Sequence, residues 1–315
     1  MQKNIFSEND SSHCFLGIDG GGTKTVFRLT DRNETVRKEI CKGSTNPNDI
    51  GMERSLSLLK EGILEICEDI SYEKITLFAG ISGGGLTGGN ADIMHRFFQS
   101  FGFFAFDNGS DLENLILLAD RNPCILVIMG TGFVVYTLNG AQRKRIGGWG
   151  QFFDEGGSGY TLGRDVITAV LCETDGSGEK TILSSLLEKQ LGESAETHLA
   201  EFYRGGKQYV ARFASLAFTA ARQGDPTAMR ILETNMAFVA QKIRTAASVF
   251  SDTDQKEIPI FFSGGLSKQH TVLFPMLQKH LYDLPCRLHV LSGEPIDGAV
   301  KRAIAIFNEK QKGNS

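Results

Sequence analysis

Four apolar runs along the chain end in glycine-rich segments. The runs cover residues 14–18, 75–81, 124–129 and 258–262. Each has the length and the aliphatic or aromatic composition of a buried strand and is bounded by a turn signal, which predicts a β-strand. Further strands are expected at 26–29, 35–40, 103–106, 133–136, 143–146 and 287–291. Strands that stop at glycine turns are therefore the recurring feature of this sequence.

Apolar residues at helical spacing predict long helices between these strands. In the segment 48–70 they recur over more than five turns, which indicates one amphipathic helix. Other helices are expected at 90–101, 111–120, 160–172, 180–191, 209–223, 226–250 and 296–310, with one more after the strand at 258–262.

One supersecondary pattern occurs twice. A strand, a Gly/Thr turn, a second strand, another turn and a third strand cover 14–40 and return at 124–146, about 110 residues later. Chance similarity of two hairpins is the alternative. The pattern favours a duplicated two-domain protein whose boundary is a compact crossover near 117–123, which agrees with a length of 315 residues.

Composition excludes several classes of protein. Thirty-three basic and 37 acidic side chains give a net charge of −4, and no Lys/Arg block suggests a nucleic-acid or membrane surface. No window has the ~18 apolar residues of a membrane span, and the polar, acidic segment 1–14 does not resemble a signal peptide. The six cysteines lie far apart. We expect a cytoplasmic protein with reduced thiols and no nucleic-acid or membrane partner.

Three glycine turns follow apolar strands, at 20–23, 130–132 and 263–265. Glycine permits positive φ and brings bare N–H groups close to an oxyanion, so the three together favour a polyphosphate ligand over plain hairpin turns. Lys24 could add a cation. The first turn leads into a strand, whereas a P-loop or a dinucleotide-binding loop leads into a helix. The expected phosphate site therefore belongs to neither of those classes.

Two carboxylates stand where strands are expected to end. Asp19 precedes the first glycine turn and could hold a phosphate-bound Mg²⁺ through water, or could simply shape the turn. Asp111 stands at a strand-to-helix junction, where it could cap the helix or accept a proton from an attacking hydroxyl. The residues alone leave both alternatives open.

The segment 147–160 is the densest cluster of polar and glycine residues. It contains the only tryptophan, two adjacent carboxylates and six glycines just before a predicted helix. Carboxylates that accept from hydroxyls and apolar surfaces that pack on a ring are features of carbohydrate sites. The loop 44–48 is a second polar segment, which could also be a helix N-cap.

These residues together resemble the N-acetylglucosamine kinase family, the BadF/BadG/BcrA/BcrD-type ATPases of the actin-like sugar kinase superfamily. The most specific stretch is Gly147-Gly148-Trp149-Gly150 with Asp154-Glu155-Gly156. The resemblance implies an α/β fold of two actin-like (ribonuclease H-like) domains with a nucleotide/sugar cleft between them. The expected domains are 1–119 and 120–295, with a C-terminal helix at 296–315 packing back on the first.

The resemblance also implies an ATP- and Mg²⁺-dependent kinase that phosphorylates the 6-hydroxyl of N-acetylglucosamine or of a close relative such as N-acetylmuramate. Asp111 would be the general base, and Asp19 the metal-side carboxylate. The implied sugar-binding residues are Asn46, Gly148, Trp149, Gly150 and Asp154. The implied nucleotide-binding residues are Gly21, Gly22, Thr23, Lys24, Gly130, Thr131, Gly132, Ala220, Gly264 and Gly265. A homodimer is expected, and the alternatives are a glucosamine kinase and a partner-coupled ATPase.

One position departs from the family pattern. The family usually follows Gly-Thr-Gly with a small polar residue, and this chain has Phe133 there. A polar contact near the sugar substituent is therefore expected to be missing or supplied by backbone. This departure leaves the choice of amino sugar open.

Overall fold

The computed structural model describes residues 13–85, 89–119, 121–140, 142–250 and 257–313. The chain forms two compact units: unit 1 consists of residues 1–120 and 292–315, and unit 2 consists of residues 121–291. The N-terminal segment on which the signal-peptide argument rests lies almost entirely outside the described residues.

Unit 1 is built on a five-stranded sheet in the order β3-β2-β1-β4-β5. Its strands are β1 (Cys14–Gly20), β2 (Lys24–Thr30), β3 (Val36–Gly43), β4 (Ile75–Ile81) and β5 (Ala105–Gly109). The first three strands form an antiparallel meander, whereas β4 and β5 run parallel to β1. The carboxyl ends of β1, β4 and β5 therefore meet at one edge of the sheet.

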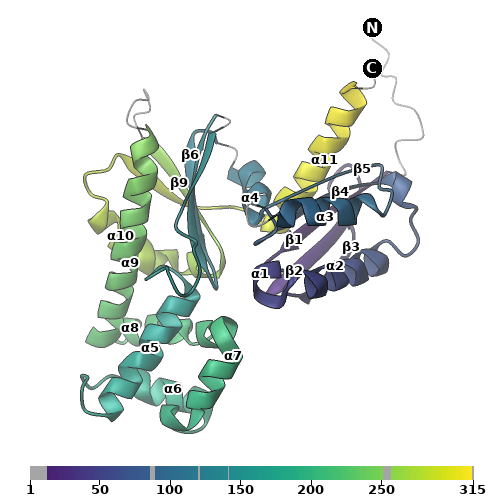
Figure 1. Cartoon of the computed structure of the whole chain (residues 1–315). Helices are drawn as coiled ribbons and strands as arrows, with labels where there is room; N and C mark the ends of the chain where they lie inside the picture. Colours follow the sequence, from purple (N-terminus) through teal and green to yellow (C-terminus); the bar gives the residue numbers. More distant parts are fainter. Residues whose placement is uncertain (1–12, 86–88, 120, 141, 251–256, 314–315) are drawn as a thin grey trace. The chain divides into compact units, whose positions relative to one another are not determined.

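Alternating side chains of β1 divide unit 1 into two cores. Leu16 and Ile18 pack with apolar residues of α2 and α3, whereas Phe15 packs with Ile296 and Phe307 of α11. Helices therefore cover both faces of the sheet (Figure 1). The helices of unit 1 are α1 (Pro47–Ile50), α2 (Met52–Ile66), α3 (Asn90–Gln99), α4 (Asp111–Ala119) and α11 (Pro295–Gly313), with a 3-10 turn, η2, at Tyr72–Lys74.

Unit 2 repeats the same sheet. Its order is β10-β9-β6-β7-β8, so β6, β7, β8, β9 and β10 correspond to β1, β2, β3, β4 and β5 in order and in direction. The strands are β6 (Cys124–Met129), β7 (Phe133–Asn139), β8 (Gln142–Ile146), β9 (Ile258–Ser263) and β10 (Cys286–Val290). The duplication expected from the repeated pattern is confirmed.

The helices of unit 2 share one apolar core with its sheet. Helix α9 packs on β6, β7 and β8, α10 packs on α9, and α5 packs on α7 and α8 (Figure 1). The helices are α5 (Gly159–Thr174), α6 (Leu183–Leu191), α7 (Leu199–Ala211), α8 (Ala214–Arg222), α9 (Pro226–Ala247) and α10 (His270–His280). The 3-10 turns are η3 (Ala195–His198), η4 (Ser248–Phe250) and η5 (Gly265–Gln269).

The predicted elements occur in the expected order, with three corrections. The helix expected at 48–70 is two helices, because Gly51 with φ of 81° ends α1 before α2 begins. The helix expected at 209–223 is also two: α7 begins earlier, at Leu199, is kinked at Gly206, and ends before α8. The strand expected at 103–106 lies at Ala105–Gly109 instead.

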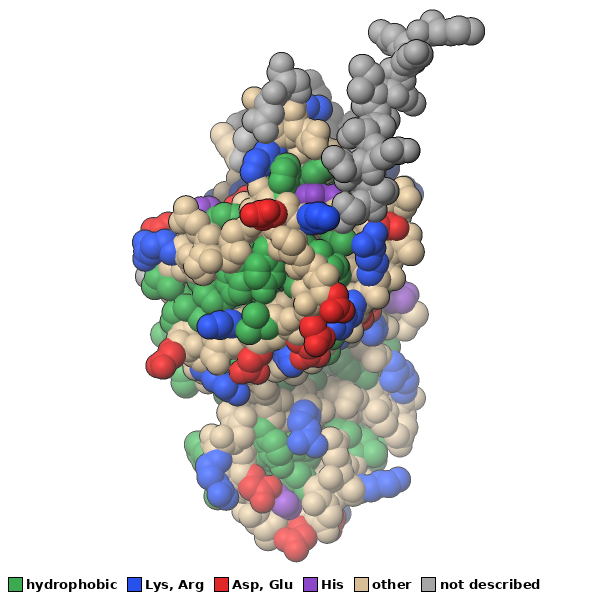
Figure 2. All heavy atoms as spheres, turned by 90° about the vertical axis from the view of Figure 1, so that its right-hand side faces the viewer, with side chains coloured by type: hydrophobic (Ala, Val, Ile, Leu, Met, Phe, Trp, Pro, Cys, Tyr) green, Lys and Arg blue, Asp and Glu red, His purple; other side chains and the backbone are tan. Residues whose placement is uncertain are grey.

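Two findings bear on the partners considered from composition. None of the helices within the described residues has both the length and the apolar character needed to span a bilayer. On the face that Figure 2 shows, acidic and basic side chains are interspersed around an apolar area.

Candidate functional site

The first glycine turn joins β1 to β2 in unit 1. The turn is closed by a hydrogen bond from Gly21 N to Lys24 O at 2.9 Å, and Ser44 Oγ donates to Gly21 O at 3.2 Å. Gly20 lies against the same loop, because an added Cβ would stand 2.6 Å from Thr45 Oγ1. Residues 44–45 therefore pack against the turn and fix its position. Lys24, at the end of the turn, is exposed.

Asn46 is 7% exposed and caps α1. Its Oδ1 accepts from Asn48 N at 3.0 Å, and its Nδ2 donates to Asp49 Oδ2 at 2.9 Å. Gly83, with φ of 73°, approaches so closely that an added Cβ would lie 2.3 Å from Asn46 Oδ1. The capping alternative is therefore realised in this structure, and the sugar contact stays a prediction.

Asp19 ends β1 beside this turn. Asn114 Nδ2 donates to its Oδ1 at 2.7 Å, and no described residue is hydrogen-bonded to its Oδ2. Burial raises the pKa of Asp19 to about 6, a rise that the Asn114 hydrogen bond opposes and the negative charge of Asp111 reinforces. A carboxylate with one free oxygen next to a glycine turn is suited to bind the water shell of a phosphate-bound Mg²⁺.

Asp111 is the first residue of α4 and is separated from the end of β5 by Ser110 alone. The electropositive end of a helix favours a carboxylate at this position. Its charge acts on Asp19, so the two carboxylates occupy one electrostatic environment. The residue that precedes the helix, at the cap position, is Ser110, and the role of Asp111 as general base stays a prediction.

The two glycine turns of unit 2 stand at the ends of neighbouring parallel strands. Gly264, with φ of 92°, follows β9 and leaves no room for a side chain, because an added Cβ would lie 2.5 Å from Met129 O. The turn after β6 is fixed by bonds from Gly159 N to Gly130 O at 2.7 Å and from Tyr160 N to Thr131 O at 3.2 Å. The start of α5 thus holds the second turn against the end of β6.

The glycine-rich loop 147–154 has a defined conformation. Asp154 is 7% exposed, and its Oδ2 accepts from Gly150 N at 2.9 Å. The Arg145 guanidinium donates to the carbonyls of Gly147 and Gly148 and lies 5.0 Å from the centre of the Trp149 ring. Gly147, Gly148 and Gly150 all have positive φ. In this conformation the Trp149 side chain is exposed, and the buried Asp154 carboxylate bonds the backbone of the loop at Gly150.

Exposed aromatic side chains are the main surface feature of this loop. Trp149 is 65% exposed, and Phe152 and Phe153 are 83% and 75% exposed. The other carboxylate oxygen of Asp154, Oδ1, accepts no hydrogen bond from a described residue. An acceptor beside apolar ring faces is suited to a carbohydrate.

A buried amide holds the end of the loop. Asn235 of α9 is 1% exposed and accepts from Gly157 N at 3.0 Å and from Thr161 Oγ1 at 2.9 Å. Ser158 and Thr161 form a capping box at the start of α5. Neither Asn235 nor Asn114 is among the residues predicted from the sequence. The available signal was a polar residue on the apolar side of a predicted helix.

Phe133, the departure from the family pattern, is 4% exposed beneath the loop. An added Cβ on Gly157 would lie 2.8 Å from its ring, and the ring meets that of Phe238 at a centroid distance of 5.8 Å. The Phe133 side chain therefore belongs to the core of unit 2, and the glycine-rich segment packs on its ring at Gly147 and Gly157.

Ala220 differs from the other expected nucleotide residues. It lies on α8 with an exposure of 0%, and its side chain belongs to the core of unit 2. Its carbonyl accepts from Gln223 N and Asp225 N. A role for Ala220 at the nucleotide stays a prediction.

The expected residues thus form one cluster in each unit. In unit 1, the Asp19 turn, the Asn46 loop and Asp111 gather at the carboxyl ends of β1, β4 and β5. In unit 2, the turns after β6 and β9 lie side by side. The loop 147–154 leads into α5, and the start of α5 is hydrogen-bonded to the turn after β6. Backbone N–H groups of glycine turns fit phosphate oxygens. Among the described residues, no group of three or more His, Cys, Asp or Glu side chains could hold a metal ion, so a Mg²⁺ would depend on phosphate and water for its other ligands.

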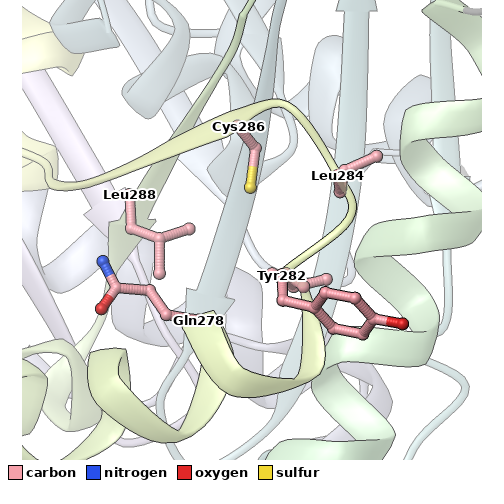
Figure 3. Close-up of a pocket in the computed structure, with 6 residues that line it drawn as sticks. Gln278, Tyr282, Leu284, Cys286 and Leu288 are labelled. Atoms are coloured by element: carbon pink, nitrogen blue, oxygen red, sulfur yellow. The ribbon is translucent and has the colours of Figure 1, made fainter.

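A cavity of about 210 Å³ lies elsewhere in unit 2 (Figure 3). It is lined by Gln278, Leu281, Tyr282, Leu284, Cys286 and Leu288. None of the expected site residues contributes to it. We therefore do not assign the candidate site to this cavity.

Two copies of a β-meander extended by parallel strands, with glycine turns at the strand ends, define the actin-like class of α/β proteins. The chain belongs to the BadF/BadG/BcrA/BcrD ATPase family, whose family model matches residues 16–300. An N-acetylmuramic acid/N-acetylglucosamine kinase of Clostridium acetobutylicum is 30% identical over 277 residues, which are 84% of this chain and 89% of that protein. An N-acetyl-D-glucosamine kinase of Dictyostelium discoideum is 24% identical over 96% of this chain and 100% of its own length.

A solved structure agrees with the fold. A protein of Chromobacterium violaceum, provisionally described as an N-acetylglucosamine kinase, matches with a TM-score of 0.74 at 23% identity, over 93% of this chain and 99% of that protein. The predicted fold class, α/β with two actin-like domains, is confirmed. The family and the kinase relatives identify the chain as an ATP-dependent sugar kinase.

Proposed function

We propose that the chain transfers the γ-phosphoryl group of ATP to the 6-hydroxyl of N-acetylglucosamine or N-acetylmuramate. Two relatives that cover most of the chain carry amino-sugar kinase names, and one of these names includes both sugars. The observation that carries the proposal is the carboxylate pair of unit 1. Asp19 stands beside a glycine turn, and Asp111 at a helix start interacts with it electrostatically.

In the proposed reaction Asp111 accepts the proton of the sugar 6-hydroxyl as its oxygen bonds to the γ-phosphorus. The bond between that phosphorus and the β,γ-bridging oxygen breaks, and ADP leaves. The glycine turns at 20–23, 130–132 and 264–265 would bind phosphate oxygens through backbone N–H groups, with Lys24 as a further cation. Mg²⁺, when bound, neutralises phosphate charge, and Asp19 would hold its water shell.

The proposed sugar contacts come from the loops described above. Asp154 Oδ1 would accept from a sugar hydroxyl, and the exposed face of Trp149 would pack on apolar parts of the sugar. Asn46 would use atoms beyond its present intrachain bonds or exchange those bonds on binding. Because Phe133 is core, it adds no polar contact, which favours recognition of the N-acyl or lactyl substituent through backbone.

The test measures ADP release from Mg-ATP with N-acetylglucosamine, N-acetylmuramate, glucosamine and glucose. We expect turnover with one or both N-acetylated sugars. Replacing the general base in Asp111→Asn should lower kcat by about 10²–10⁴-fold and leave sugar affinity largely unchanged. The same assay on Asp107→Asn, a neighbouring carboxylate to which no role is assigned, serves as the matched control.

Two other functions give different results in this assay. Turnover of glucosamine alone would indicate a glucosamine kinase. ATP hydrolysis at the same rate with and without every sugar would overturn the kinase proposal and favour a partner-coupled ATPase. The expected homodimer is tested separately by light scattering of the purified chain.

A further inference from the structure

Asn114 is a buried amide that the proposed mechanism does not use. It lies on α4 three residues after Asp111, so the two residues are neighbours on one side of the helix. Its exposure is 0%. A fully buried amide usually has both its donors and its acceptor satisfied.

The hydrogen bonds of Asn114 determine the orientation of its amide. Nδ2 donates to Asp19 Oδ1 at 2.7 Å and to Gly80 O at 3.2 Å. Both partners are acceptors, so only the N–H end of the amide can face them. The bond to Asp19 is short, as expected when the acceptor is a carboxylate.

The remaining atom of the amide is left unpaired. Asn114 Oδ1 is buried and has no hydrogen-bond partner among the described residues. An unpaired buried oxygen lowers the stability of a fold. An apolar residue of similar size would avoid this loss, so stability alone does not account for asparagine at this position.

Two glycines admit Asn114 to its position. At Gly80 of β4 an added Cβ would lie 2.1 Å from Asn114 Oδ1, and at Gly298 of α11 it would lie 1.6 Å from Asn114 O. Both β4 and α11 therefore contact α4 at Asn114 through a glycine, which has no side chain. This close packing brings the Asn114 amide within hydrogen-bond distance of Asp19, a residue 95 positions earlier in the sequence.

We propose that Asn114 is a positioning residue for the metal side of the site. By binding Oδ1 of Asp19 it leaves Oδ2 as the oxygen available to the water shell of a nucleotide-bound Mg²⁺. Because the same helix begins with Asp111, α4 sets the positions of the general base and of the metal-side carboxylate together. This inference rests on the proposed function, since it assigns Mg²⁺ to Asp19.

The test compares the affinity for a non-hydrolysable ATP analogue with Mg²⁺ and with excess EDTA, measured calorimetrically without sugar. The wild-type chain should bind more tightly with Mg²⁺. Asn114→Leu, which has a similar size, should lose roughly 10- to 100-fold of the Mg²⁺-dependent affinity and keep its metal-free affinity. Asn114→Asp, which replaces the donor by an acceptor, should lose at least as much.

Two controls separate positioning from structure. Leu115→Ala removes a buried side chain from the same helix without touching Asp19, so it should lower the melting temperature and preserve the Mg²⁺ effect. In an Asp19→Asn background, Asn114→Leu should not change the ratio of the affinity with Mg²⁺ to the affinity in EDTA any further. If Asn114→Leu does not fold, Asn114→Ala replaces it in the same measurements.

The outcomes distinguish this inference from the proposed function. If the wild-type chain binds no nucleotide, the proposed function fails. If it binds with an Mg²⁺ effect that the Asn114 variants retain, or that Leu115→Ala loses equally, positioning by Asn114 is refuted and the kinase proposal stands. An absence of any Mg²⁺ effect in the wild-type chain also refutes the inference.

Discussion

Asp19 is a residue whose ionised side chain lowers the stability of the fold. Its side chain is partly buried, its pKa is raised to about 6, and one of its oxygens accepts a hydrogen bond from Asn114. The nearby charge of Asp111 adds to the cost of keeping it ionised. Such a carboxylate is disfavoured in the free protein and favoured when a cation binds beside it.

The stability of the ligand-free chain should therefore depend on Asp19 in a pH-dependent way. The folded pKa of about 6 lies above the ordinary value of 3.8, so the ionised form destabilises the fold. This penalty is complete above about pH 6 and vanishes below about pH 4. At 1.36 kcal/mol per pKa unit it is at most about 3 kcal/mol.

Asp19→Asn should consequently raise the melting temperature near pH 7.5 in EDTA and leave it unchanged near pH 4. Thermal unfolding of both chains across this range checks the prediction. A variant that is less stable than the wild type at every pH would contradict it.

At the scale of elements, helix α11 depends on close approach to its neighbours. Its residues Ile296, Ala299 and Ala303 form a core with β1, β2 and β4, and Gly298 lies directly against the backbone of α4 at Asn114. The small residues allow the helix to lie flat on the sheet and beside α4. The position of α4, and with it Asp111, is therefore coupled to the C-terminal helix.

Gly298→Ala should destabilise unit 1. The added methyl group would stand 1.6 Å from the Asn114 carbonyl oxygen, and only movement of one helix backbone relieves the clash. We expect a loss of about 1–3 kcal/mol or more in the free energy of unfolding, together with weaker Mg²⁺-nucleotide binding. Gly313→Ala, the same change in the same helix with no atom within 4 Å, should be nearly neutral. Equal effects of the two substitutions would refute this interpretation of the contact.

At the scale of the whole molecule, the chain builds one unit from two segments and the other from one. Residues 121–291 form unit 2 without a break, whereas unit 1 needs 292–315 to complete it. The core on the α11 face of the first sheet includes Phe15, Phe78 and Phe307. Removal of the C-terminal segment would expose that face.

A fragment of residues 121–291 should therefore fold alone with a cooperative thermal transition, and residues 1–120 should not. The shorter fragment should bind a hydrophobic dye, and co-expression with residues 292–315 should restore its cooperative melting. Circular dichroism and dye fluorescence check this result. Cooperative folding of residues 1–120 alone would contradict it.

The local pattern of residues predicts much of the fold. Alternation, apolar runs and turn residues predicted every strand to within a few residues, together with the glycine turns and the duplicated meander. It failed where one residue overrode a periodic pattern, as Gly51 does between α1 and α2. A glycine with positive φ ends the helix there although the apolar spacing continues across it.

The sequence by itself determined the elements, the turns and the carboxylates at their ends, because strand and helix periods and turn chemistry act over a few residues. Only the tertiary structure decided that Asn114 binds Asp19, that Asn235 holds the glycine loop and that Phe133 is core. These contacts join residues far apart in the chain. Their partners are chosen when whole elements pack together, which no local pattern encodes.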